Sequence, residues 1–365
     1  VIIDALLGTG LSKAVTEIYG QAIQTINKSQ SKVIAVDVPS GLDSDTGSVM
    51  GCAVKALCTV TFIGLKRGLF TGTAPDYCGE ILYSSLAVPK EVFKNFSSTT
   101  YRVVKKNFPP RTRCSHKGDH GHVLIIGGDR GYLGAARMAG EAALRVGAGL
   151  VSIATHPEHA AILNLGRPEL MCHGVDNVDL LTPLLDKANA IVIGPGLGQS
   201  KWAAELFIAA IKSDKALVID ADGLNLLVHI PEKHPNWILT PHPGEAARLL
   251  RCATADVQQD RFAAIAAIQA KYDGVVVLKG AGTLIAASDE IAVSTTGNPG
   301  MASGGMGDVL SGVIAGLMAQ GFSRKDAAQQ GVYLHGMAGD LAVEQLGERG
   351  LLASDLMPYL RQLVN

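Results

Sequence analysis

Short apolar runs separated by glycine-rich turns recur along the whole chain of 365 residues. The first group covers residues 1–6, 33–38 and 58–63, and a helical pattern follows the first of these runs to about residue 27. A second group covers 122–126, 150–154, 190–193, 216–219, 237–239 and 275–278. Buried strands that alternate with helical patterns are typical of parallel α/β sheets, whose ligands collect at the carboxyl ends of the strands.

The apolar pattern lapses between the two groups of runs. Residues 104–117 contain two prolines and a basic cluster, and no aromatic stacking platform of the kind that a nucleic-acid surface uses accompanies this cluster. We therefore predict an N-terminal unit over residues 1–102, a linker over 103–117 and a second unit over 118–365. Because the chain opens directly on a strand pattern, we also expect the first unit to begin in mid-domain.

The stretch 298–312 carries the strongest indication of chemistry. It is rich in glycine and runs into a helical pattern that starts near Asp308. Free backbone amides at the start of a helix favour a phosphate group, and an acid placed there can accept a proton during phosphoryl transfer. The small residues Gly312 and Gly316 suggest close packing of this helix beside a bound nucleotide. The alternative is a tight loop followed by an ordinary helix-terminal acid.

Other strand ends carry further candidates. Lys279 is followed by two glycines within three residues, which offers a positive charge and free amides to the phosphates of a nucleotide. His242 is held between two prolines on a loop that follows a strand. The alternatives are a surface lysine in a hairpin and a structural histidine.

Polar residues also follow the strands of the first unit. Asp4, Asp37 and Ser40 stand at predicted strand ends, where their oxygens are suited to a metal cation or to ribose hydroxyls. A role in capping the turns is the alternative for each. Gly8 and Gly10 lack the third glycine of the dinucleotide-binding motif, and the phosphate-binding loop motif of nucleotide hydrolases does not occur in the sequence.

Composition excludes several classes of function. A net charge of −1 gives no general attraction to nucleic acid or membrane, so an anionic ligand must be bound locally. No apolar run reaches the length of roughly 20 residues that a membrane span needs. The six cysteines form no Cys-x-x-Cys pair, which favours reduced thiols in a cytoplasmic location over a zinc site. The sequence leaves homo-oligomer formation open.

Two motifs of the first unit resemble the NAD(P)H-hydrate epimerase domain: Asp-Ala-Leu-Leu-Gly-Thr-Gly and Asp-Val-Pro-Ser-Gly-Leu-Asp. The resemblance covers roughly residues 1–95 and implies that Asp4 and Ser40 bind potassium and that Asp37 contacts the damaged nucleotide. The turn that it assigns to the same ligand consists of Gly8, Thr9, Gly10, Leu11, Ser12, Lys13 and Ala14. The upstream Asn-Asn-Gly-Gly-Asp-Gly stretch of that family does not occur, so we expect a truncated epimerase domain, a partial Rossmann-like α/β unit with an incomplete site.

The second unit resembles the ADP-dependent NAD(P)H-hydrate dehydratases, whose fold is similar to ribokinase. Its motifs include Gly-Pro-Gly-Leu-Gly, Thr-Pro-His-Pro-Gly-Glu, Leu-Lys-Gly-Ala-Gly-Thr and Asn-Pro-Gly-Met-Ala-Ser-Gly-Gly-Met-Gly-Asp. The resemblance implies a catalytic Asp308, which also contacts the hydrate. It assigns ADP to Lys279, Gly280, Ala281, Gly282, Thr283 and Gly307. It assigns the hydrate pocket to Ala136, Gly196, Gly198 and His242.

Together the two resemblances imply a bifunctional NAD(P)H-hydrate repair enzyme. Its dehydratase is expected to use ADP and Mg²⁺ to return (6S)-NAD(P)H hydrate to NAD(P)H, and its epimerase domain is expected to bind K⁺ and act on the R and S hydrates. The main alternative is a kinase of the same fold that phosphorylates a small vitamin precursor. A nucleotide sensor without catalysis is a further alternative, which the presence of Asp308 disfavours.

Overall fold

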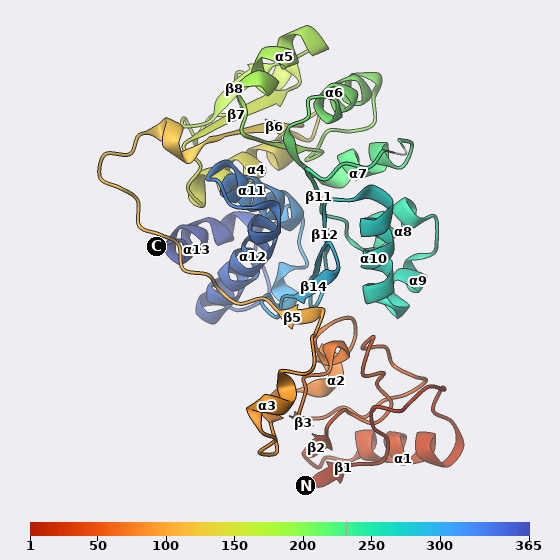
Figure 1. Cartoon of the computed structure of the whole chain (residues 1–365). Helices are drawn as coiled ribbons and strands as arrows, with labels where there is room; N and C mark the ends of the chain where they lie inside the picture. The colour runs from red at the N-terminus through yellow and green to blue at the C-terminus, as the bar shows by residue number, and fades with distance from the viewer. Residues whose placement is uncertain (231) are drawn as a thin grey trace.

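The computed structural model describes residues 1–230 and 232–365, which form a smaller N-terminal unit and a larger C-terminal unit (Figure 1). The smaller unit contains a four-stranded parallel sheet in the order β1-β2-β3-β4. Its strands are β1 (Ile2–Asp4), β2 (Val33–Val36), β3 (Cys58–Phe62) and β4 (Glu80–Ser84). Its helices are α1 (Glu17–Lys28), α2 (Pro75–Cys78) and α3 (Lys90–Phe93).

The larger unit is built on a ten-stranded sheet in the order β5-β14-β13-β12-β11-β10-β9-β6-β7-β8. Neighbouring strands are parallel except on the two sides of β13, where it pairs antiparallel with β12 and with β14. The strands are β5 (Thr100–Arg102), β6 (His122–Ile126), β7 (Leu150–Thr155), β8 (Met171–Gly174), β9 (Ala190–Ile193), β10 (Ala216–Ile219), β11 (Trp237–Leu239), β12 (Val275–Leu278), β13 (Leu284–Ala287) and β14 (Glu290–Val293).

Helices cover both faces of the large sheet (Figure 1). One face carries α4 (Leu133–Arg145), α11 (Met306–Ala319), α12 (Arg324–Leu346) and α13 (Leu356–Leu363). The opposite face carries α5 (Val178–Lys187), α6 (Lys201–Ile211), α7 (Ala221–Leu227), α8 (Pro243–Leu250), α9 (Thr254–Gln259) and α10 (Arg261–Tyr272). The predicted α/β class is confirmed, since helices cover both faces of a mostly parallel sheet in three layers.

Alternation along the strands explains why both faces need helices. In β6, Val123 and Ile125 belong to the core on the α11 side, whereas Leu124 and Ile126 belong to the core on the α10 side. All four side chains are fully buried. A strand that is apolar on both faces must be covered on both faces. Continuous apolar runs in the sequence therefore predict helices on both sides of the sheet.

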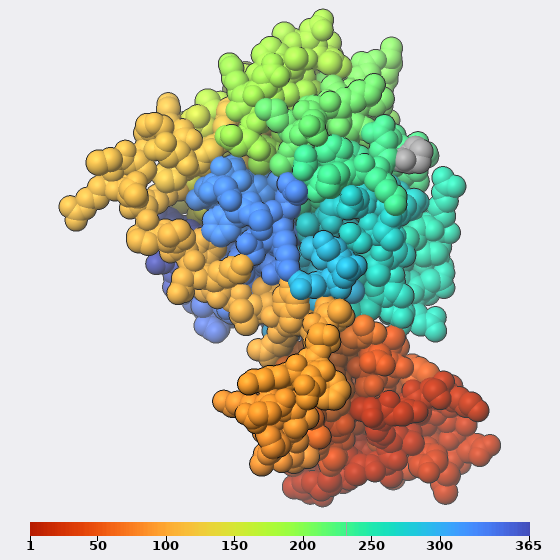
Figure 2. Space-filling view, viewed as in Figure 1, coloured from red at the N-terminus to blue at the C-terminus, as the bar shows by residue number. Residues whose placement is uncertain are grey.

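The first strand of the large sheet lies before the predicted linker. β5 pairs in parallel with β14 at the edge of the large sheet, with Tyr101 opposite Ala292. Residues 100–102 therefore belong structurally to the larger unit, although the sequence pattern assigns them to the N-terminal unit, which it predicts over residues 1–102. From Val104 to Arg111 the chain has no regular secondary structure. Figure 2 shows the smaller unit as a distinct lobe attached beside this edge.

Glycines join α11 closely to α4. A Cβ atom at Gly312 would lie 2.0 Å from the carbonyl oxygen of Ala139, and one at Gly316 would lie 2.6 Å from Val146 Cγ2. The expectation that this face of α11 packs beside a nucleotide is therefore corrected: it packs against another helix. Close approach of two backbones is the physical reason for these glycines.

This contact leads to a stability prediction. We expect Gly312→Ala to lower the free energy of unfolding by about 1–3 kcal/mol, because the added methyl group must displace the backbone of α4. Gly134→Ala is the matched control, since Gly134 lies in α4 with open space around it, and this variant is expected to gain up to about 1 kcal/mol. Denaturant titration measures both. A Gly312→Ala variant as stable as the unchanged chain would contradict the packing argument.

Within the two described ranges, no helix combines the length and the apolar character needed to cross a membrane.

Candidate active site

The loop before α11 presents free amides at the start of that helix. Asn298 fixes the loop, because its side chain accepts a hydrogen bond from the Gly300 amide at 3.0 Å and donates one to Asp340 of α12 at 2.9 Å. Helix α11 then begins at Met306, and within residues 1–230 and 232–365 no side chain caps its first amides. Asp308 lies in this first turn. The donors of the turn and the helix dipole therefore remain available to an anion.

Asp308 belongs to an acidic cluster, which consists of Asp220, Asp222, Glu245 and Asp308 around the ammonium of Lys279. Lys279 Nζ lies 2.8 Å from Asp220 Oδ1 and 3.7 Å from Glu245 Oε2. Both carboxylates are almost fully buried, with 1% and 5% of their residues exposed. The cluster is assembled at the carboxyl edge of the large sheet, where β10 and β12 end.

The surroundings of Asp308 raise the pKa of its carboxyl group to about 7. Burial raises this pKa, and the negative charges of Asp220, Asp222 and Glu245 add to this effect, while Lys279 opposes it. Burial also disfavours the charge of Lys279, but Asp220 and Glu245 outweigh burial and raise the pKa of the ammonium. Asp308 can therefore accept a proton near neutral pH, whereas Lys279 stays charged.

The loop over 279–283 meets the start of α11. A Cβ atom at Gly307 would lie 3.2 Å from Lys279 Nζ and 3.5 Å from Asp220 Oδ2. The Lys279 amide donates to the Pro241 carbonyl at 2.9 Å, which ties this loop to the loop that carries His242. Thr283 closes the turn through a hydrogen bond from its hydroxyl group to the Gly280 carbonyl at 2.9 Å. The structure thus brings together Lys279, Gly307 and Asp308 as the sequence predicts.

His242 is the N-cap of α8. Its Nδ1 accepts a hydrogen bond from the Gly244 amide at 3.0 Å, while its own backbone amide donates to Glu245 Oε2 at 2.7 Å. Half of its side chain is exposed, and burial of the rest lowers the pKa of the imidazole. The neutral ring therefore has its capping nitrogen occupied and carries its proton on Nε2 beside Glu245. The structural role that we considered for this histidine is present, and the exposed edge remains open to a ligand.

Of the predicted hydrate residues, Gly196 and Gly198 lie on one of two interlocked loops. The amides of Gly128 and Asp129 donate to the carbonyls of Pro195 and Gly196 at 3.0 and 2.7 Å. The Gly198 amide donates to Asp222 Oδ2 at 2.9 Å, which connects this region to the acidic cluster. Ala136 is fully buried in the core beneath these loops, so its side chain does not line an open pocket in this structure.

In the smaller unit, Asp4 and Ser40 lie in contact. The Ser40 hydroxyl group donates to Asp4 Oδ1 at 2.6 Å, and the Ser40 amide donates to Asp4 Oδ2 at 2.8 Å. Both residues are buried. Asp37 does not join them, because its Oδ1 accepts from the Thr61 hydroxyl and the Phe62 amide, both at 3.0 Å, and from the Lys66 ammonium. These partners outweigh the effect of burial and lower the pKa of the Asp37 carboxyl group.

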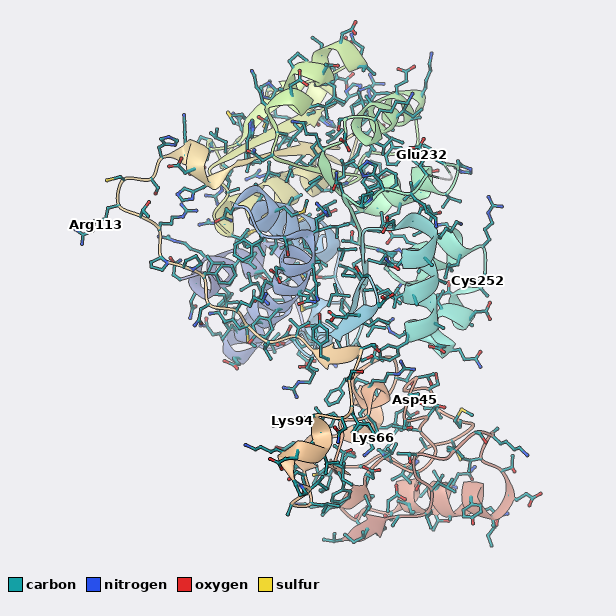
Figure 3. The ribbon with its side chains drawn as sticks, in the orientation of Figure 1. Asp45, Lys66, Lys94, Arg113, Glu232 and Cys252 are labelled. Atoms are coloured by element: carbon teal, nitrogen blue, oxygen red, sulfur yellow. The ribbon has the colours of Figure 1, made fainter. Side chains whose placement is uncertain are left out.

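A cavity of about 720 Å³ lies between the smaller unit and the edge of the large sheet. Thr9, Asp37 and Lys66 line it from one side, and Tyr101 and Arg102 of β5 line it from the other. Figure 3 shows Asp45 and Lys66 in the part of the smaller lobe that faces the large sheet. Most of the turn over 8–14 is exposed, and only its Thr9 borders this cavity.

Comparison with known proteins assigns both units. The family profile described as NAD(P)H-hydrate dehydratase matches residues 123–362, and the profile described as the YjeF-related protein N-terminus matches residues 1–68. A bifunctional NAD(P)H-hydrate repair enzyme of Coxiella burnetii is 55% identical over 370 residues, which cover 100% of this chain and 76% of that protein. The chain belongs to the bifunctional NAD(P)H-hydrate repair enzymes.

Solved structures similar to this repair enzyme agree with its fold. An ADP/ATP-dependent NAD(P)H-hydrate dehydratase of Bacillus subtilis, co-crystallised with ATP and Mg²⁺, has 31% identity and a TM-score of 0.63, and the match covers 70% of this chain and 93% of that one. A ribokinase-like protein of Enterococcus faecalis has 31% identity and a TM-score of 0.67, over 74% and 96% of the two chains.

These findings decide between the interpretations of the sequence. Membership of the repair-enzyme family confirms the resemblance and excludes a vitamin-precursor kinase or a nucleotide sensor as the best description of the chain. The N-terminal family profile matches residues 1–68, which confirms that an epimerase-type domain precedes the dehydratase unit.

Sequence reasoning missed the carboxylates that surround Lys279. Asp220 and Asp222 follow β10 in an Asp-Ala-Asp-Gly turn, and Glu245 belongs to the Thr-Pro-His-Pro-Gly-Glu run. Both runs were recognisable as strand ends, but a local pattern does not indicate that an aspartate near residue 220 and a lysine near residue 279 face each other. An acidic residue after several strands of one parallel sheet was the available signal.

Proposed function

We propose that the larger unit dehydrates (6S)-NAD(P)H hydrate with ADP as phosphoryl donor and yields NAD(P)H, AMP and phosphate. The observation that carries the proposal is the position of Asp308. It lies in the uncapped first turn of α11, beside Lys279, with a pKa raised to about 7. A carboxylate so placed can take a proton from a hydroxyl group while the amides of the same turn bind the phosphoryl group.

The chemistry follows from the poor leaving ability of hydroxide. The ring hydroxyl oxygen of the hydrate attacks the β-phosphorus of ADP, its proton passes to Asp308, and AMP leaves. The lone pair of the ring nitrogen then expels inorganic phosphate, and loss of a ring proton restores the double bond of NAD(P)H. Lys279 is proposed to neutralise the phosphates, and the first amides of α11 to stabilise the charge that develops on the transferring group.

Magnesium fits this site as a companion of the nucleotide. No group of three His, Cys, Asp or Glu side chains among residues 1–230 and 232–365 is arranged to hold a metal ion, and the cysteines there are free thiols. Asp220 and Glu245 are already engaged by Lys279. Mg²⁺ is commonly bound through one or two carboxylates together with substrate phosphates. We therefore expect Mg²⁺ to enter with ADP, where it would neutralise phosphate charge.

For the smaller unit we propose interconversion of the R and S hydrates. The oxygens of Asp4, Ser40 and the Leu7 carbonyl converge within hydrogen-bond distance, since Ser40 Oγ lies 2.6 Å from Asp4 Oδ1 and 3.2 Å from the Leu7 oxygen. Such an oxygen set is suited to K⁺. Asp37 uses one carboxylate oxygen for its own support, and its Oδ2 accepts no hydrogen bond within the described chain, so it can accept one from a ribose. The turn over 8–14 is proposed to contact the same nucleotide.

One assay tests the proposed dehydration. Purified protein is incubated with the S hydrate of NADH, ADP and Mg²⁺, and the absorbance of reduced nicotinamide is followed while AMP and phosphate are quantified. Stoichiometric formation of NADH, AMP and phosphate is the expected result. A phosphorylated product that accumulates without return of NADH would instead indicate a kinase. A cytoplasmic location and assembly into a homo-oligomer remain predictions.

The raised pKa of Asp308 leads to a prediction about pH. Asp308 is protonated and cannot act as a base below its pKa, so kcat/KM for ADP is expected to rise with pH through an inflection near 7. Asp222 is one of the charges that raise this pKa. Asp222→Asn should therefore move the inflection to lower pH, and an asparagine oxygen can still accept the hydrogen bond from the Gly198 amide. A flat profile, or an inflection that Asp222→Asn leaves in place, would contradict this assignment.

A further inference from the structure

A buried arginine lies behind the loop over 279–283. Arg261, the first residue of α10, is 1% exposed. Its Nη2 donates to the carbonyls of Leu278 and Lys279 at 3.2 and 3.1 Å, and its Nη1 donates to Gln258 at 2.9 Å. In the described ranges no carboxylate forms an ion pair with it. Burial lowers the pKa of the guanidinium to about 10, so it remains charged at neutral pH.

The Nε donor of Arg261 reaches the smaller unit. Arg261 Nε donates to Thr71 Oγ1 at 3.0 Å, and the Thr71 hydroxyl group in turn donates to the Gly282 carbonyl at 2.8 Å. The Gly72 amide donates to the Ala281 carbonyl at 3.3 Å. Thr71 is fully buried. A continuous set of hydrogen bonds therefore runs from residues 71–72 through Arg261 to the loop that is proposed to hold ADP.

Two glycines of the loop leave no room for a side chain beside these contacts. A Cβ atom at Gly282 would lie 1.7 Å from the Phe70 carbonyl oxygen, and Gly282 has a φ of +60°. A Cβ atom at Gly280 would lie 3.2 Å from Arg261 Nη1. The absence of side chains at these positions therefore lets the loop lie between Arg261 and the smaller unit.

Two further contacts join the smaller unit to the start of α10. The Arg67 guanidinium lies 4.5 Å from the ring centre of Phe262, and the Ser48 hydroxyl group donates to the Gln259 carbonyl at 2.6 Å. The start of α10 is thus fixed against the smaller unit on both sides of Arg261.

We propose that Arg261 is a positioning residue for the nucleotide loop and that Thr71 of the epimerase domain completes its support. The inference rests on the proposed binding of ADP by residues 279–283. Arg261 holds the carbonyls of Leu278 and Lys279 from behind, which fixes the direction of the Lys279 side chain and of the following amides. The epimerase domain thereby contributes to the affinity of the dehydratase for ADP without contacting the ligand.

The test uses the full chain with Arg261→Met, Arg261→Lys and Thr71→Val. We expect each to raise the KM for ADP by about 5- to 20-fold, within the usual range of coupling between sites, while the KM for the hydrate and kcat change less. Arg261→Lys keeps the charge but not the fork of donors, so failure of lysine to rescue distinguishes positioning from charge. Thr73→Val is the matched control, because the Thr73 hydroxyl group donates to the Gly47 carbonyl, which also belongs to the smaller unit.

Hydrogen exchange supplies a second measurement. ADP should slow exchange of the Gly72 amide, because binding would order the loop whose Ala281 carbonyl accepts from this amide. If Arg261→Met does not fold, Thr71→Val and the Gly72 amide decide the question. If ADP affinity is unchanged in the Arg261→Lys and Thr71→Val variants, and if ADP does not change the exchange rate of the Gly72 amide, this inference is wrong while the proposed function stands. Failure of the unmutated chain to bind ADP would overturn the proposed function and this inference together.

Discussion

Asp308→Asn is expected to lower kcat by about 10²- to 10⁴-fold while the chain still binds ADP, because an amide cannot accept the proton of the hydrate. Binding of ADP should stay similar or tighten, since removal of a carboxylate beside the phosphates relieves repulsion between like charges. Single-turnover kinetics and calorimetric titration with ADP measure the two effects separately.

Stability distinguishes this role from that of an ordinary helix-terminal acid. The raised pKa means that ionised Asp308 is disfavoured in the folded chain. At a pH above 7, Asp308→Asn should therefore melt at the same or a higher temperature. Removal of an acid that only complements the helix dipole would instead lower the free energy of unfolding by about 0.3–1 kcal/mol. Asp179→Asn, in the exposed first turn of α5, is the control for that effect. A variant that melts lower and keeps more than about a tenth of wild-type turnover would remove Asp308 from the mechanism.

The sequence predicted β6, β7, β9, β10, β11 and β12 of the large sheet because these strands are largely apolar on both faces, whereas β5, β8, β13 and β14 were not predicted. The runs at 122–126, 190–193, 216–219, 237–239 and 275–278 coincide with β6, β9, β10, β11 and β12. β5 was not predicted, since Thr100–Arg102 is short, half-exposed and at an edge. Its place in the sheet depends on pairing with β14, which lies about 190 residues further along the chain.

The site was only partly predictable for a related reason. Lys279, Gly307 and Asp308 follow recognisable glycine turns, and parallel topology brings such turns to one edge. The partners of Lys279 depend instead on strand order, because β10 and β12 are separated by β11 in the sheet. Glycines were also ambiguous in the sequence. Gly282 and Gly312 both read as sites for a nucleotide, and each also lies against a backbone carbonyl of another element, so the sequence alone does not show which contact requires the glycine.

Lys279→Met is expected to lower the free energy of unfolding by about 3–5 kcal/mol, the range for removal of one partner from a buried ion pair. Lys279 is the positive charge among four carboxylates, and only 19% of its side chain is exposed. Denaturant titration measures the loss. Lys325→Met is the matched control, because Lys325 pairs with Glu290 at the surface, where removal is expected to cost no more than about 1 kcal/mol.

The stability of Lys279→Met should also depend on pH in a way that reflects the charges of the site. Lys279 lowers the pKa of Asp308, so without it Asp308 takes up a proton more readily in the folded chain. Stability then falls as pH rises, and the loss should be larger near roughly pH 8 than near roughly pH 6. Adding Asp220→Asn removes the carboxylate that Lys279 contacts at 2.8 Å and should restore part of the stability, although ADP affinity stays low because the phosphates still lack the ammonium. If Lys279→Met costs no more than Lys325→Met, or if Asp220→Asn adds to the loss, the acidic cluster does not depend on Lys279 for its charge balance.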